Sequence, residues 1–182
     1  MEVYEDDIVG FCFLPSGPEL ISEFLVKKVV GLPLSRNIIH DDIDVYLYHP
    51  DQLPIPNCED RDWAYFFLFR APEEEEFRPT PYGYWEEIKS EKEYNYESWR
   101  RAIGFRKTFA FYEGEVPNGK MTDWRMKEYR LNRELSVFKN PKDPKMKNCV
   151  VCKVFKKVDI PDVPMILYDS EEFSESEEED DK

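Results

Sequence analysis

Short apolar and aromatic runs separated by turn-forming residues restrict the fold of this chain more than any other feature. The runs cover residues 64–69, 105–112, 124–131 and 149–155. They are typical of β-strands, because β-branched and aromatic side chains pack well on a pleated sheet. Glu113-Gly114 and Pro117-Asn118-Gly119 predict turns between the second and third runs. The pattern therefore predicts an antiparallel sheet.

A helix is predicted before the strands. Ser16 and Glu19 have the spacing of a capping box, in which a hydroxyl and a glutamate three residues later complete the first helical turn. Apolar residues follow at helical spacing, which predicts a helix to about Lys28. Residues 36–48 are ambiguous and could form a short helix that leads into an extended segment. A helix followed by strands predicts an α+β fold.

The distribution of charge is more informative than the net charge of −14. Residues 1–99 contain 8 basic and 22 acidic side chains, and residues 158–182 contain 1 and 11. Residues 100–157 contain 16 basic and 6 acidic side chains. A local basic field attracts a polyanion even in an acidic chain, although a solvated basic face neutralised by the remaining acids fits the same counts.

Basic and aromatic residues are interleaved within this basic segment. Arg106 and Lys107 are adjacent in a predicted strand and should point to opposite faces of the sheet. Residues 124–130, WRMKEYR, continue the pattern. The basic side chains either contact phosphates or outline a solvated face above a core that holds Trp124 and Tyr129. Periodicity does not separate the two interpretations.

No motif indicates catalysis, a cofactor or a small-molecule substrate. Cys149 and Cys152 have a ligand-like spacing, but a structural zinc ion needs four ligands and no second pair accompanies them. The valines around these cysteines indicate a buried strand instead. No phosphate-binding glycine motif and no nucleophile elbow occurs, so we expect neither an enzyme nor a metal site.

The two ends of the chain give further expectations. The N-terminal residues MEVYEDDIVG have no basic start, which argues against a signal peptide, and no apolar run is long enough to span a membrane. Residues 158–182 are acidic with few apolar residues, which predicts a disordered tail. The tail fits either an activation segment or a solubilising one.

Five ordered blocks of sequence point to a family. Residues 10–21, GFCFLPSGPELI, are similar to GFRFHPTDEELI, and residues 43–54 are similar to DLYKYEPWDLP. Residues 63–67 with 83–85 form the third block. Residues 103–131 are similar to VGIKKTLVFYKGRAPKG followed by TDWVMHEYRL, and residues 152–157 are similar to CRIFKK. These blocks resemble the plant NAC (no-apical-meristem-type) transcription factors.

The resemblance implies a fold, a partner and a location. It implies a NAC domain over residues 6–157, with a twisted antiparallel sheet flanked by helices, that binds double-stranded DNA in the nucleus and pairs with itself or with other NAC proteins. Glu19 matches a dimer-interface glutamate, but Cys12 replaces the arginine with which it pairs in the family. The candidate DNA-binding residues are Lys92, Arg106, Lys107, Arg125, Lys127 and Arg130.

The strand that reads DNA in the family departs from the family motif here. In that motif, WKATGKDK, only Trp85 and a basic residue at Lys92 are kept, and Glu86 and Glu87 stand where the family has lysine and alanine. Each acid in place of a base removes a phosphate contact and adds repulsion. The chain is therefore either a DNA-binding regulator with a degraded reading strand or an interaction module that no longer reads DNA and modulates other NAC proteins by pairing.

Overall fold

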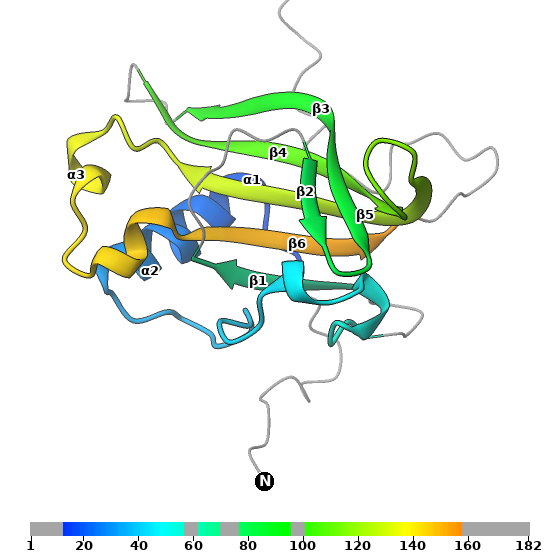
Figure 1. Ribbon diagram of the computed structural model, residues 1–182. Coiled ribbons are helices and arrows are strands. Elements are labelled where there is room, and N and C mark those ends of the chain that lie inside the picture. The colour runs from blue at the N-terminus through cyan, green and yellow to red at the C-terminus, as the bar shows by residue number, and fades with distance from the viewer. Residues whose placement is uncertain (1–12, 57–61, 70–76, 96–100, 158–182) are drawn as a thin grey trace, which may run out of the picture.

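The fold is built on one six-stranded antiparallel sheet, with strand order β1-β6-β5-β4-β3-β2 (Figure 1). The computed structural model describes residues 13–56, 62–69, 77–95 and 101–157. The strands are β1 (Trp63–Leu68), β2 (Phe77–Thr80), β3 (Gly83–Asn95), β4 (Ala102–Glu113), β5 (Lys120–Leu131) and β6 (Val150–Lys156).

A continuous helical segment precedes the sheet, formed by α1 (Gly17–Glu19), the π-helical turn η2 (Leu20–Leu25) and α2 (Val26–Val30). The predicted capping box is present at its start. Gly31 ends the segment in the left-handed region at φ 76°, and its N–H donates to carbonyls of the last turn. Glycine adopts this conformation without the steric cost of a Cβ atom.

Two apolar cores lie on opposite faces of the sheet, because successive residues of a strand point to opposite sides. We call the face covered by α1, η2 and α2 the helix-side face; there, Ile21 and Leu25 pack with Tyr65 and Phe67 of β1. We call the other face the turn-side face. It packs against residues of the 3₁₀ turns η3 (Val45–Leu47) and η4 (Pro50–Gln52) and the segments beside them, and it includes Phe66, Trp85 and Phe109. Figure 1 shows the blue helices and the cyan turns on opposite sides of β6.

The α+β fold and the strands expected from the sequence are confirmed, with β4 and β5 longer at their N-terminal ends than predicted. β3 was expected only from the family resemblance, and the short strand β2 was missed. Residues 36–48 form neither a helix nor a strand beyond one bridge from His40 to Phe66 and the turn η3. Cys149 lies just before β6, after α3 (Ser136–Lys139) and η5 (Pro144–Asn148).

Two expectations lie outside the described residues: Cys12 at the dimer interface and the acidic tail over 158–182. Within the described ranges, no helix is long and apolar enough to cross a membrane.

Candidate nucleic-acid interface

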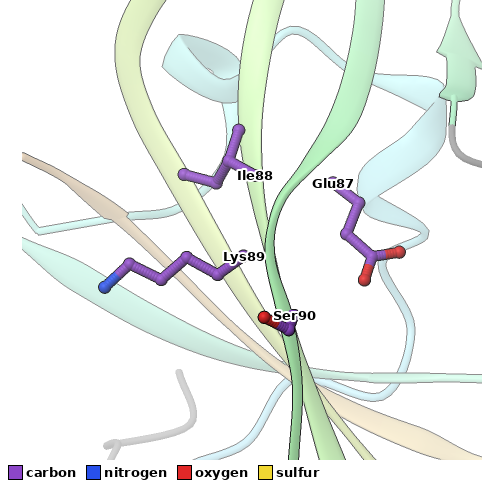
Figure 2. A pocket seen from close by; sticks show the side chains of 4 residues that line it. All are labelled: Glu87, Ile88, Lys89 and Ser90. Atoms are coloured by element: carbon purple, nitrogen blue, oxygen red, sulfur yellow. The ribbon is translucent and has the colours of Figure 1, made fainter.

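The strand β3 is an edge strand over most of its length. β2 pairs only with Gly83–Glu86, and among the described residues no strand pairs with the outer side of 87–95. The register with β4 shifts between Glu87 and Lys89 and again between Lys89 and Lys92, which are β-bulges. Bulges bend an edge strand and redirect its side chains. Figure 2 shows Ile88 and Lys89 on one side of the β3 ribbon and Glu87 on the other. Together with Ser90, these residues line an open depression of about 380 Å³.

Four of the six predicted DNA-binding residues lie on the helix-side face. Lys92 of β3 is directly opposite Arg106 of β4, which is opposite the buried Tyr129 of β5. Arg125 and Lys127 are on the same face of β5, because they alternate with Trp124 and Met126 of the turn-side core. The sheet therefore brings these basic residues together across three neighbouring strands.

The register adds two lysines that the sequence reasoning left out. Lys89 is opposite Thr108, Thr108 is opposite Lys127, and Lys127 is opposite Lys153 of β6. The alternation of Lys153 with the buried Cys152 and Val154 was the available signal for its face, but it becomes decisive only when the strand order is known. We call the following residues the cationic face: Lys89, Lys92, Arg106, Arg125, Lys127 and Lys153.

Aromatic rings and backbone carbonyls position several of these cations. The Lys153 Nζ lies 5.0 Å from the ring centroid of Trp63 and 5.4 Å from that of Phe155. The Lys127 Nζ lies 6.0 Å from the same Phe155 ring. Arg125 donates to the backbone carbonyls of Thr122 at 2.6 Å and Trp124 at 2.9 Å. Cation–π contacts hold a charged head over an aromatic ring.

The other two predicted residues, Lys107 and Arg130, point to the turn-side face, and both are paired with carboxylates of β3. Lys107 Nζ is 3.0 Å from Glu87 Oε2. One guanidinium nitrogen of Arg130 is 2.7 Å from each carboxylate oxygen of Glu91, and its Cζ lies 4.4 Å from the Phe105 ring centroid. The four charged side chains are 21–28% exposed. Adjacent residues Arg106 and Lys107 thus lie on opposite faces, as predicted.

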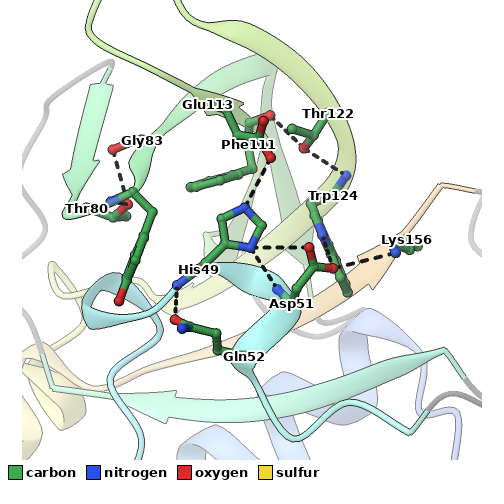
Figure 3. Close-up of polar contacts among 11 residues, drawn as sticks. His49, Asp51, Gln52, Thr80, Gly83, Phe111, Glu113, Thr122, Trp124 and Lys156 are labelled. Carbon is green, nitrogen blue, oxygen red and sulfur yellow. Dashed lines mark hydrogen bonds and ion pairs between the residues drawn. The ribbon is translucent and has the colours of Figure 1, made fainter.

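Other acids of this region are also engaged. Burial and then Glu86 raise the pKa of Tyr112, and Glu86 pairs with Ala110, two residues before Tyr112 on β4. His49 Nε2 is 3.2 Å from Glu113 Oε1, while its Nδ1 accepts a hydrogen bond from the Asp51 N–H (Figure 3). Figure 3 also shows Asp51 joined to the Trp124 indole N–H and to Lys156, at 3.1 Å and 3.6 Å.

Glu19, the predicted dimer-interface residue, caps its own helix. Its carboxylate accepts hydrogen bonds from the backbone N–H of Ser16 at 2.9 Å and from the Ser16 hydroxyl at 3.0 Å. The Ser16 hydroxyl in turn accepts from the Glu19 N–H. This local role does not depend on a second chain, and the dimer role stays a prediction.

Cys149 and Cys152 are buried free thiols. Burial raises the pKa of Cys149 to about 12 and raises that of Cys152 well above its usual value. Thiols bind zinc as thiolates, so burial disfavours the ligand form of both residues. In the part of the chain that the structure describes, no three His, Cys, Asp or Glu residues are grouped to hold a metal ion.

Comparison with known proteins gives one consistent result. Residues 8–131 match the family model described as no apical meristem (NAM) protein. The chain is 34% identical over 163 residues to NAC domain-containing protein 22 of Oryza sativa subsp. japonica, an alignment that covers 86% of this chain and 50% of the relative. It is 36% identical over 153 residues to NAC domain-containing protein 79 of Arabidopsis thaliana, covering 81% and 45%. NAC domain-containing protein JA2 of Solanum lycopersicum is 33% identical over 175 residues, covering 91% and 48%. The chain thus spans about half the length of these relatives.

Proposed function

The chain belongs to the no apical meristem (NAM) protein family, and on that premise we propose that it is a regulator of transcription that contacts double-stranded DNA through its cationic face. The observation that carries the proposal is the register. It aligns Lys89, Lys127 and Lys153 in one row across β3, β4, β5 and β6, with Lys92 and Arg106 in the next row. The site of action is the nucleus.

The contact is mainly with phosphates. Lysine and arginine side chains on a sheet meet the charged backbone of a duplex, which supplies affinity but no base readout. Base readout in the family depends on the edge strand, where this chain has Glu86, Glu87 and Ile88. Binding is therefore weaker and less sequence-selective than binding by a chain with the WKATG motif intact.

A titration of duplex DNA over a range of salt concentrations tests this proposal. The full chain is titrated with a duplex bearing the CACG core that the family resemblance implies, beside a scrambled duplex. The test variant is Arg125→Gln/Lys127→Gln, and the matched control is Lys142→Gln/Lys145→Gln, which removes two exposed cations outside the cationic face. We expect the test variant to lose affinity about tenfold for both duplexes and to show a shallower salt dependence. Equal affinity of test and control variants would contradict the proposal.

A second function is favoured by one specific observation: Lys107 and Arg130 are already neutralised by β3 carboxylates. This arrangement suits an interaction module that modulates other NAC proteins by pairing rather than by reading DNA. Sizing chromatography of the chain mixed with the NAC domain of a relative distinguishes the two. If the chain forms a mixed species with the relative's NAC domain and binds neither duplex, the interaction module replaces the first proposal.

A further inference from the structure

We propose that Glu87 and Glu91 are affinity-setting residues, because they withhold Lys107 and Arg130 from a polyanion. The inference rests on the proposed function in one respect: it takes duplex DNA as the polyanion. It goes beyond that function by adding a second set of cations, on the turn-side face, that are already bound by carboxylates of the same chain.

The bulges of β3 bring both carboxylates to the turn-side face. From Glu87 to Lys92, β3 advances five residues, while its partner β4 covers only Phe109 to Arg106. The extra residues break the strict alternation of β3. Glu87 stays opposite the turn-side Phe109, and the Glu91 carboxylate reaches across β4 to Arg130 on β5.

Both ion pairs have the geometry of persistent contacts. The Glu91 carboxylate holds one Arg130 nitrogen with both oxygens, and the Phe105 ring below the guanidinium restricts its movement. The Lys107 side chain is 21% exposed. A half-buried pair is less screened by salt than an exposed one, so a phosphate has to displace a carboxylate that is already in place.

Removing the two carboxylate charges should therefore release two cations. In the full chain, Glu87→Gln/Glu91→Gln retains the side-chain shape. The control variant is Glu93→Gln/Glu134→Gln, which makes the same change in net charge at exposed residues that have no ion-pair partner in the described ranges. Two readouts are compared: duplex affinity by fluorescence anisotropy, and the salt concentration that elutes each chain from immobilised heparin. Thermal unfolding checks that each variant is folded, and Glu91→Gln alone replaces the double variant if the latter is not.

We expect the test variant to bind the duplex about tenfold more tightly than the control and to elute later from heparin. Its salt slope should steepen by about two, since two further cations replace counterions. Adding Lys107→Gln/Arg130→Gln to the test variant should remove the gain, whereas adding Lys142→Gln/Lys145→Gln should leave most of it.

Two results overturn the inference: equal behaviour of test and control variants in both assays, or a gain that survives the loss of Lys107 and Arg130. Other results separate it from the proposed function. Later heparin elution of the test variant without duplex binding by any variant supports the withholding of Lys107 and Arg130 from a polyanion other than duplex DNA, and refutes the proposed function. Duplex binding by the unchanged chain, with no difference between test and control variants, supports the proposed function alone.

Discussion

Arg78 of β2 and Glu128 of β5 form an ion pair inside the turn-side core, although β4 and β3 separate the two strands in the sheet. Their residues are 9% and 4% exposed, and Arg78 Nη2 donates to Glu128 Oε1 at 3.0 Å. The Tyr46 hydroxyl contacts both side chains. It accepts a hydrogen bond from Arg78 at 2.6 Å and donates one to Glu128 at 3.2 Å. Burial lowers the pKa of Arg78, but Tyr46 and Glu128 outweigh that effect and the net pKa is raised.

This buried pair gives the first prediction. Glu128→Gln leaves the Arg78 charge buried without its partner, and loss of one member of a buried pair costs about 3–5 kcal/mol in the free energy of unfolding. Urea unfolding followed by tryptophan fluorescence measures this loss. Replacing both residues, as Arg78→Met/Glu128→Leu, should recover most of the stability, because no unpaired charge remains. A double variant as unstable as Glu128→Gln would contradict the explanation.

The capping box gives the second prediction. Ser16→Ala removes the acceptor for the Glu19 N–H, and we expect a loss of about 1 kcal/mol in the free energy of unfolding. Glu19→Ala should cost a similar amount, whereas Glu19→Gln keeps an acceptor for the Ser16 N–H and should cost less.

Light scattering separates this capping role from pairing between chains. If Glu19 acts only within its helix, Glu19→Gln and the unchanged chain have the same mass at every protein concentration. A mass that falls on substitution would show that Glu19 also contacts a second chain.

The buried thiols and Tyr46 give the third prediction, on alkaline pH. The pKa values of Cys152 and Tyr46 are raised in the folded chain by burial. The folded chain therefore keeps protons that the unfolded chain loses, so stability is full below the unfolded pKa values and declines as pH rises past about 9. We expect each group to contribute a slope of up to about 1.4 kcal/mol per pH unit.

Urea unfolding in reducing buffer between about pH 8 and about pH 10.5 measures that slope. Cys152→Ala should make this slope smaller, while Tyr46 and Cys149, whose pKa values are also raised, keep their contributions. Val151→Ala, at the neighbouring buried residue, should lower stability and leave the slope unchanged. If both variants retain the slope, Cys152 is not the group responsible.

The fourth prediction compares a cation of each face. Lys127→Gln removes a charge from the cationic face, and we expect a loss of duplex affinity of about fivefold or more. Lys107→Gln removes a charge that Glu87 already neutralises, so its effect should be smaller. Anisotropy titrations of both variants at one salt concentration make the comparison, and a larger effect of Lys107→Gln would contradict the assignment of the faces.

Much of the fold follows from local pattern, but β2 does not, and β3 was expected only from the family resemblance. The predicted strands and the capped helix carry their own signals, because period-2 alternation and a capping box are written in neighbouring residues. β2 has four residues, including Pro79, and no local pattern distinguishes it. It is held by pairing with the start of β3 and by the buried contact between Arg78 and Glu128, neither of which is visible from a four-residue stretch.

The same distinction applies to the candidate site. Adjacency in a strand placed Arg106 and Lys107 on opposite faces, and composition placed the basic residues in one segment. Nothing local indicated that Lys153 would join Lys127, or that Glu91 would reach Arg130, because those contacts depend on strand order and on the two bulges of β3.

Residue types at short spacing were sufficient to predict most of the strands, the capped helix, the family and the acidic character of the edge strand. What those acids do depends on contacts that only the folded chain makes. The carboxylates of Glu87 and Glu91 lie against Lys107 and Arg130 because the sheet register brings strands distant in sequence within hydrogen-bonding range. The attraction between two charges weakens as the distance between them grows, and the fold sets the distances between side chains on different strands.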